Sequence, residues 1–254
     1  MKRYERYVAI GDSTSEGLDD PDGRGGYRGW ANRLAEHIAA RQGSLLYANL
    51  AIRGRTTRQI LEEQLAPALS MQPDLTTVVA GTNDVLRRHF DRAAFQHDLE
   101  TMQRAFVETG ATVLTFTLPD LTPVMPLARV LGDRVAQLND AIRDACRNTN
   151  AILLDLAAYP VATDPRLWSD DRLHANAEGH ARIAEALAHA LGIEGFDKSW
   201  AEPFPDAHAP TTMDLVRAEL AWCRRHLLPW IWRHLRGRSS GDGIRAKRPT
   251  LMPV

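Results

Sequence analysis

Tyr7-Val8-Ala9-Ile10-Gly11-Asp12-Ser13 joins a short apolar run to a polar turn near the start of the chain. Consecutive apolar residues that end at a glycine are typical of a buried β-strand. Ser13 comes directly after this predicted strand. Open α/β sheets bind their ligands at the carboxyl ends of the strands, so we expect the Ser13 hydroxyl to face a functional cleft.

Similar apolar runs recur downstream, and segments with helical spacing lie between them. Predicted strands cover Leu45–Leu50, Leu75–Ala80, Thr112–Phe116 and Ala151–Leu154. Predicted helices cover Trp30–Ala40, a segment capped by Thr56 or Thr57 that includes Ile60 and Leu65, Phe95–Phe106, about Arg129–Arg147, and a last segment from the cap Asn176 to about Leu191. This alternation predicts a three-layer α/β/α sandwich around a five-stranded parallel sheet.

Four short polar segments follow predicted strands or precede predicted helices. They are Gly11-Asp12-Ser13, Asn49-Leu50-Ala51 leading to Gly54, Gly81-Thr82-Asn83-Asp84, and Asp171-Arg172-Leu173-His174. They supply a hydroxyl nucleophile, an imidazole base with a carboxylate to orient it, and small or amide residues able to hold an oxyanion. Because these groups are complementary, one shared active site is favoured.

Each segment has a second interpretation when it is taken alone. Gly-Asp-Ser is also typical of a turn or a helix cap, and Asn83-Asp84 of an Asx turn. Asp171 and His174 can also form an ordinary salt bridge in a loop. His180 and His189 fall inside the following predicted helix, where packing or surface positions are expected.

The order and spacing of the four segments resemble those of the SGNH hydrolase family, also called GDSL esterases and lipases. The resemblance implies the flavodoxin-like fold of that family. It assigns Ser13 as nucleophile, His174 as general base and Asp171 as the carboxylate that orients His174. It assigns the oxyanion hole to the backbone N–H groups of Ser13 and Gly54 and to the side-chain amide of Asn83.

The resemblance covers about residues 7–191 and also decides between neighbouring candidates. In the family, the nucleophile comes directly after Gly-Asp, which favours Ser13 over Ser15. The orienting acid comes three residues before the histidine, which favours Asp171 over Asp170.

The expected activity is hydrolysis of a small-molecule or lipid ester by a serine esterase of the carboxylesterase or lysophospholipase kind. An acyltransferase with the same site is one alternative, and a membrane- or protein-binding module acting through residues 211–254 is another. Asn49 and Asp84 are expected to hold loops in place by hydrogen bonds. The loop Leu118–Pro126, with Val124, Met125 and Leu127, is expected to line a pocket for an apolar acyl group.

Motifs for other chemistries are incomplete. The chain lacks the Gly-x-Ser-x-Gly elbow of the larger α/β-hydrolase family. Gly23–Arg28 lacks the third glycine of a dinucleotide site, and no phosphate-loop lysine is present. A calcium loop through Asp19–Asp22 would begin at Leu18 and end at Gly29, neither of which carries a carboxylate. The sequence therefore implies neither a metal nor an organic cofactor.

The composition is typical of a globular protein, with 44% hydrophobic and 25% charged residues in a chain of 254. The net charge of −1 hides an asymmetry: residues 217–254 hold nine basic and two acidic residues, so they carry +7 and the rest of the chain −8. Cys146 and Cys223 fit neither a disulfide framework nor metal-ligand spacing. No signal-peptide or transmembrane pattern is found, and a cytoplasmic location is expected.

The chain is expected to divide into a catalytic domain over residues 1–195 and a C-terminal part over residues 196–254. The C-terminal part contains a proline-bearing linker, a predicted basic amphipathic helix from Thr211 or Thr212 to about Leu228, and a tail. The apolar side chains are Leu215, Trp222, Leu227, Trp230, Ile231 and Leu235, and the basic ones Arg217, Arg224, Arg225, Arg233 and Arg236.

Two roles suit this basic helix. Packing of its tryptophans on the catalytic domain, or on a second copy of the chain in a homo-oligomer, is favoured because it is the commoner fate of an amphipathic helix. Peripheral contact with an anionic membrane is the alternative. Nucleic-acid binding is not expected, because no recognition motif accompanies the arginines. From Arg236 onward, the sequence is compatible with a docked strand or with disorder.

Overall fold

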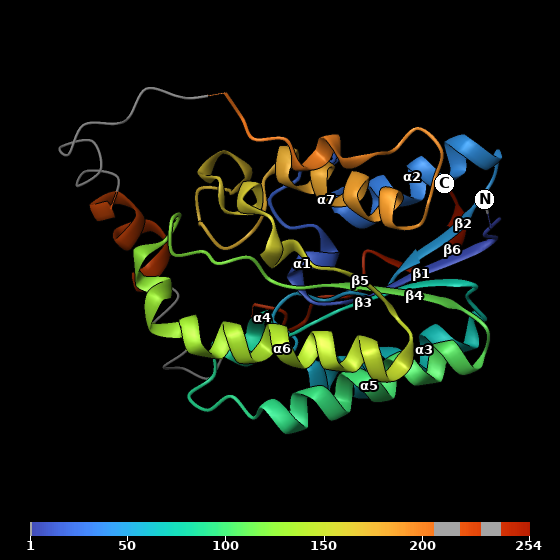
Figure 1. Cartoon of the computed structure of the whole chain (residues 1–254), viewed down its shortest axis with the longest axis horizontal. Helices are drawn as coiled ribbons and strands as arrows, with labels where there is room; N and C mark the ends of the chain where they lie inside the picture. The colour runs from blue at the N-terminus through green and yellow to red at the C-terminus, as the bar shows by residue number, and fades with distance from the viewer. Residues whose placement is uncertain (1, 206–218, 230–239) are drawn as a thin grey trace.

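The computed structural model describes residues 2–205, 219–229 and 240–254 (Figure 1). A six-stranded sheet lies at its centre, in the order β5-β4-β3-β1-β2-β6. The strands are β1 (Arg6–Gly11), β2 (Leu46–Asn49), β3 (Leu75–Val79), β4 (Thr112–Phe116), β5 (Ile152–Leu154) and β6 (Arg248–Pro253). The first five run parallel, which confirms the predicted five-stranded parallel sheet.

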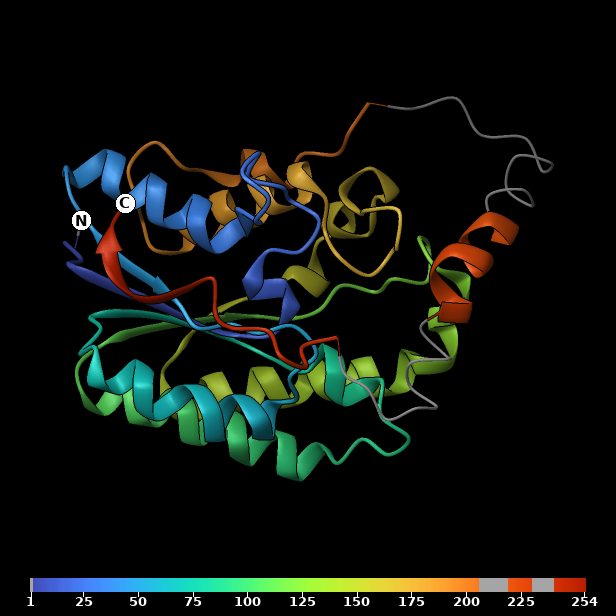
Figure 2. The same cartoon turned by 180° about the vertical axis from the view of Figure 1, so that it is seen from behind.

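Helices cover both faces of this sheet, as Figures 1 and 2 show. On one face lie α2 (Gly29–Gln42) and α7 (Ala177–Ala190), and on the other α3 (Thr57–Ser70), α5 (Arg92–Glu108) and α6 (Gly132–Thr149). Two short helices, α1 (Ser13–Glu16) and α4 (Thr82–Val85), follow β1 and β3. Short 3-10 helices are η1 (Pro126–Leu131), η2 (Leu156–Ala158), η3 (Pro160–Thr163), η4 (Pro165–Leu167) and η5 (Lys198–Ala201). The predicted α/β/α sandwich is confirmed.

Local signals explain where several helices begin. Thr56 and Gln59 form a capping box at the start of α3. Asn176 accepts a hydrogen bond from the Gly179 N–H, which confirms it as the cap of α7. Strand β3 is buried along its whole length, as expected for an inner strand covered by helices on both faces.

The sixth strand is one of the two alternatives that the sequence left open for the tail. β6 pairs antiparallel with β2 and places Met252 opposite Tyr47. Most of its side chains are exposed, so it lacks the alternation of a half-buried strand. Pro249 and Pro253 carry no backbone N–H, which a sheet tolerates only at an edge. Residues 248–253 of the tail are therefore docked as a strand.

The predicted linker after α7 packs closely on the fold. Trp200 of η5 is buried and its ring lies 4.5 Å from that of Tyr159, centroid to centroid. Phe204 lies against the guanidinium groups of Arg166 and Arg182, a cation–π arrangement. Up to residue 205, this segment is thus attached to the catalytic domain.

Residues 219–229 are helical and include a π-helical turn, η6 (Cys223–Leu227). Trp222 is buried against the domain, while Arg224 and Arg225 are exposed. The predicted start of this helix and the side chains of Leu215, Arg217, Leu227, Trp230, Ile231, Arg233, Leu235 and Arg236 lie outside the described residues. None of the described helices has the length and apolar composition that a membrane span requires.

Candidate active site

Ser13 begins α1 at the carboxyl end of β1. Asp12 caps this helix, and its Oδ1 accepts a hydrogen bond from the Thr14 N–H at 3.0 Å. The turn needs a glycine at position 11, because a Cβ there would lie 2.4 Å from the Val79 carbonyl oxygen. The Gly-Asp-Ser turn therefore brings Ser13 to the edge of the sheet.

His174 links Ser13 to Asp171. Its Nε2 lies 2.8 Å from Ser13 Oγ, and its Nδ1 lies 2.6 Å from Asp171 Oδ2. With the ring proton on Nδ1, His174 donates to the carboxylate and presents Nε2 as an acceptor to the serine hydroxyl. The structure thus brings together three side chains that the resemblance assigns to the site, across 161 positions of sequence.

The surroundings shift the pKa values of this pair in opposite directions. Burial acts to lower the pKa of His174, but the hydrogen bond and charge of Asp171 raise it above the ordinary value. The charges of Asp19 and Asp12 add to this increase. Burial acts to raise the pKa of Asp171, yet bonds from the His174 ring and from backbone N–H groups hold it well below the usual range. Asp171 is therefore a carboxylate at neutral pH.

The neighbouring candidates are placed differently. Ser15 is fully buried, and its hydroxyl has no hydrogen-bond partner within the described part of the chain. Asp170 is exposed and makes no hydrogen bond with His174. His180 is buried with both ring nitrogens bonded to backbone groups. Burial lowers the pKa of His180 to about 4, so this residue is a neutral packing group, as expected.

Gly54 lies on the loop between β2 and α3. Its φ of +77° is in the left-handed region that favours glycine. The preceding residue, Arg53, donates its backbone N–H to Glu16 Oε2 at 2.8 Å, and its guanidinium pairs with the same carboxylate. Because Glu16 belongs to α1, the loop of Gly54 is tied to the helix that carries Ser13.

Asn83 of α4 reaches the same region with its side-chain amide. Nδ2 donates to the Arg55 carbonyl at 3.0 Å and to Asp12 Oδ2 at 3.3 Å. Both amide hydrogens are therefore engaged in the free site. The contact with Asp12 is the longer of the two, and burial raises the pKa of the Asp12 carboxyl to about 6.

Asn49 and Asp84 hold loops, as the sequence predicted. Asn49 Nδ2 donates to the Ser15 carbonyl at 2.8 Å, which joins β2 to α1. Asp84 accepts hydrogen bonds from the N–H and the hydroxyl of Thr57, which joins α4 to the start of α3.

Three residues that contact the Asp171 loop were missed by the sequence analysis. Ser169 Oγ lies 2.7 Å from Asp171 Oδ1 and 2.6 Å from Asp19 Oδ2. Trp222 donates its Nε1–H to the Asp171 carbonyl at 3.0 Å. Asp19 is 150 positions from Ser169, and Trp222 is 51 positions from Asp171, so no local motif could have indicated these contacts.

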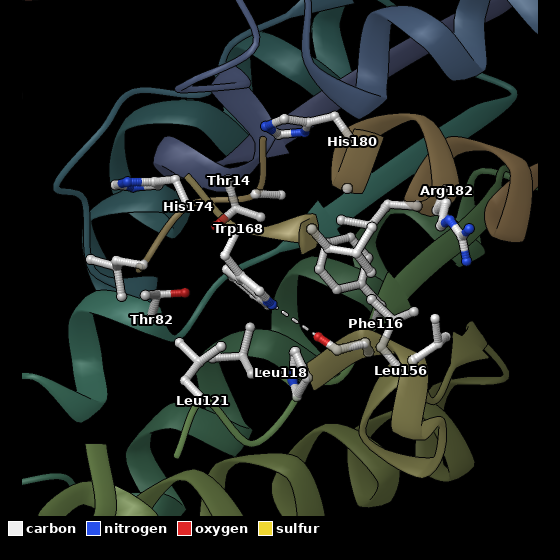
Figure 3. A pocket seen from close by; sticks show the side chains of 18 of the residues that line it. Thr14, Thr82, Phe116, Leu118, Leu121, Leu156, Trp168, His174, His180 and Arg182 are labelled. Atoms are coloured by element: carbon white, nitrogen blue, oxygen red, sulfur yellow. Dashed lines mark hydrogen bonds between the residues drawn. The ribbon is translucent and has the colours of Figure 1, made fainter. Parts of the chain in front are cut away.

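An apolar cavity of about 80 Å³ lies beside His174 (Figure 3). Its volume is several times the ~10–15 Å³ that holds one water molecule. Thr14, Thr82 and His174 lie at one side of it. The apolar lining includes Phe116, Leu118, Pro119, Leu121, Leu156, Val161, Leu167 and Trp168.

The loop that the sequence predicted to line an acyl pocket lines this cavity only in part. Leu118 and Leu121 line the cavity, whereas Val124 and Met125 are not among its lining residues. The chain turns back after Leu121, since the Met125 N–H donates to the Leu121 carbonyl at 2.7 Å. The side chain of Leu127 lies outside the described residues.

A metal ion has one group of candidate ligands among the described residues, formed by Asp19, Asp171 and His174. The His174 Nδ1 and Asp171 Oδ2 atoms are 2.6 Å apart, which is the length of a short hydrogen bond. A cation bound by both would have to replace the proton that joins them. The arrangement therefore fits an orienting hydrogen bond better than a metal centre.

A parallel α/β sheet that brings a serine, a histidine and an aspartate into contact at its carboxyl edge is typical of hydrolases. Within that class, the chain belongs to the GDSL-like lipase/acylhydrolase family, whose model matches residues 9–182. No curated protein sequence matches the chain.

Solved structures of hydrolases share the fold. A lipase/acylhydrolase from Enterococcus faecalis is 22% identical, with a TM-score of 0.61 over 80% of this chain and 100% of that chain. A psychrotrophic esterase from Pseudoalteromonas sp. is 19% identical, with a TM-score of 0.60 over 74% and 97%. An acetylxylan esterase from Geobacillus stearothermophilus is 18% identical, with a TM-score of 0.62 over 78% and 96%.

Proposed function

We propose that this protein is a serine esterase that hydrolyses its substrate through an acyl-enzyme on Ser13. The observation that carries the proposal is the pair of contacts made by His174, 2.8 Å to Ser13 Oγ and 2.6 Å to Asp171 Oδ2. A serine hydroxyl is a weak nucleophile unless a base removes its proton during attack. Within the described part of the chain, His174 is the base in hydrogen-bond contact with Ser13.

In the first step, Ser13 Oγ attacks the ester carbonyl carbon while its proton moves to His174 Nε2. Asp171 holds the Nδ1 proton and stabilises the imidazolium that forms. His174 then donates the proton from Nε2 to the leaving alcohol oxygen, and the bond from carbonyl carbon to that oxygen breaks. In the second step, a water oxygen attacks the acyl carbon while its proton moves to His174 Nε2. The bond from that carbon to Ser13 Oγ then breaks, His174 returns the proton to Ser13 Oγ, and the carboxylic acid leaves.

The negative charge on the tetrahedral intermediate needs donors at the edge of the sheet. We propose the N–H of Ser13, which lies in the first turn of α1, where helical N–H groups lack intrahelical partners. The Gly54 N–H and the Asn83 amide complete the set. Each such donor is typically worth about 10²–10³ in kcat.

The cavity in Figure 3 supports an apolar acyl group on the substrate. It begins at His174 and Thr14, next to Ser13, and its lining side chains are mainly aliphatic and aromatic. Each methylene buried there contributes about 0.8 kcal/mol, or roughly fourfold in kcat/KM, until the cavity is full. We therefore propose that esters of short to medium acyl chains react faster than acetates.

The test is a comparison of wild type, Ser13→Ala and Ser15→Ala on p-nitrophenyl esters from acetate to long acyl chains. We expect Ser13→Ala to abolish turnover and Ser15→Ala to retain it, because the Ser15 hydroxyl is buried and bonds none of the described residues. Turnover that survives in Ser13→Ala would overturn the proposal.

A second pair of variants tests the pocket. Ala162 lines the cavity, so Ala162→Phe should move the chain-length optimum to shorter esters while acetate turnover stays within about twofold. Ala158→Phe adds the same group at an exposed position outside the cavity and should leave the optimum unchanged. An optimum that moves equally in both variants would contradict the assignment of this cavity to the acyl chain.

A further inference from the structure

His174 has a second carboxylate beside it. Asp19 Oδ2 lies 3.9 Å from His174 Nδ1, compared with 2.6 Å for Asp171 Oδ2. Sequence reasoning considered Asp170 as the alternative acid, but that side chain is exposed and Asp19, from the loop after α1, is the one that approaches the ring. Two carboxylates thus converge on the same ring nitrogen.

The position of Asp19 is fixed by Ser169. The Ser169 hydroxyl lies 2.6 Å from Asp19 Oδ2 and 2.7 Å from Asp171 Oδ1. One hydroxyl carries one proton and donates to one of these oxygens at a time, so it links the two acids directly. A weaker bond from the Asp171 N–H to Ser169 Oγ, at 3.4 Å, adds to the link.

The backbone of Asp19 points to the same conclusion. Its φ of +67° is in the left-handed region, which is uncommon for a residue other than glycine. Such conformations persist where the surrounding structure requires them, and they concentrate at functional sites. Here the conformation accompanies a carboxylate placed against Ser169 and the His174 ring.

We propose that Asp19 is a positioning residue for His174: a second orienting acid, held by Ser169, that stabilises the imidazolium and supports a small residual activity when Asp171 is removed. To replace Asp171, Asp19 Oδ2 would have to approach Nδ1 by about 1.3 Å, the difference between the two distances. This inference rests on the proposed function, because it assumes that His174 is the base that serves Ser13.

Other charged groups also affect the pKa of His174, so the test must separate the effect of Asp19 from theirs. Asp171 bonds the ring directly and Asp12 contributes its charge, while the charge of His174 acts to lower the pKa of His180. The charge of Asp19 acts to raise the pKa of His174, in the same direction as Asp171 and Asp12. Removing Asp19 should therefore lower the pKa of His174 without breaking the bond to Asp171.

The experiment compares kcat/KM against pH, on one p-nitrophenyl ester, for Asp19→Asn, Asp171→Ala and the double variant. Asn keeps the size of Asp19 and tolerates the left-handed backbone. We expect Asp19→Asn to lower kcat/KM by about 3- to 10-fold and to move the acid-limb midpoint to lower pH. When Asp171 is already replaced by alanine, the fold-loss in kcat/KM caused by Asp19→Asn should be at least about 10 times the fold-loss that it causes in the wild type. Such non-additivity is expected because the two acids are coupled.

Three controls make the result specific. Asp170→Asn removes a charge from the same loop, at an exposed position, and should move neither the midpoint nor kcat/KM. Ser169→Ala should reproduce the effect of Asp19→Asn, and Ser169→Thr should restore activity by returning the hydroxyl. An NMR titration of the His174 ring in each variant measures its pKa without any turnover.

The role of Asp19 would be overturned if Asp19→Asn caused the same fold-loss in kcat/KM in the wild type and in Asp171→Ala. It would also be overturned if Asp19→Asn left the pKa of His174 unchanged. Ser13→Ala belongs in the same set of proteins. If it retains turnover, the proposed function itself fails. If Ser13→Ala loses turnover, but the fold-loss of the double variant equals the product of the two single fold-losses, only the proposal of a second orienting acid is refuted.

Discussion

At the scale of single residues, the site combines a motif that sequence reveals with contacts that it hides. The Asp-x-x-His spacing predicted that Asp171 and His174 would meet, because residues three apart in a loop can bond each other, and the structure places them 2.6 Å apart. Asp19 could not be predicted, since its contact with Ser169 spans 150 positions and depends on how the α1 loop folds. A spacing rule identifies near neighbours only.

The pKa of His174 gives a prediction at this scale. A general base must be neutral to accept a proton, and the pKa of His174 is raised, chiefly by Asp171 against the effect of burial. Activity should therefore fall as pH drops through a midpoint above 6.5, the ordinary histidine value. Asp171→Asn should cripple turnover with the fold intact. A wild-type midpoint below 6.5, or full activity in Asp171→Asn measured by the same pH series, would contradict this role.

At the scale of elements, the buried strands and the longer helices followed from the sequence, whereas the sequence left the C-terminal strand undecided and did not show where the C-terminal helix docks. The parallel strands are short, mainly apolar runs bounded by glycine or polar turns, and β3 and β4 also contain threonines. Their length of six residues or fewer favours strands over helices. β6 has mostly exposed side chains and a proline near each end, so neither alternation nor apolar content marks it. The helix at residues 219–229 was predicted, but its contact with the Asp171 loop was not.

Trp222 provides the prediction for this element. It is 6% exposed and donates its Nε1–H to the Asp171 carbonyl, and Glu219 of the same helix pairs with Arg172. Trp222→Phe should lower kcat/KM by about 2- to 10-fold, the size expected for one lost hydrogen bond. Leu220→Ala, at a side chain 67% exposed on the same helix, should change little. Equal losses in both variants would show that the helix acts only through general stability.

At the scale of the whole molecule, part of the basic C-terminal segment packs against the acidic remainder of the chain. The basic tail returns to the acidic body, where Lys247 Nζ donates to the carbonyls of Tyr27 and Arg28 at 2.9 and 2.8 Å. Burial lowers the pKa of Lys247 to about 8, although the charges of Glu16 and Asp20 act in the opposite direction. The sequence showed the charge difference, but the docking site required the three-dimensional fold.

The tail also reaches the loop of Gly54. A Cβ on Gly241 would lie 2.0 Å from the Arg53 carbonyl oxygen, so Gly241→Ala must displace that backbone. We expect kcat to fall by about 10-fold or more with a smaller change in KM, because the Gly54 N–H is a proposed oxyanion donor. Thr250→Ala, an exposed change in β6, is the matched control. An unchanged kcat in Gly241→Ala would separate the tail from the oxyanion hole.

The most direct measurement is to locate the covalent adduct formed with a fluorophosphonate ester, a reagent that labels activated serines. Tandem mass spectrometry of wild type, Ser13→Ala and His174→Ala would show which residue is modified. A single adduct on Ser13, absent from Ser13→Ala and strongly slowed in His174→Ala, is the predicted result. An adduct on Ser15 or another serine, or equal labelling of Ser13 without His174, would contradict the proposed mechanism.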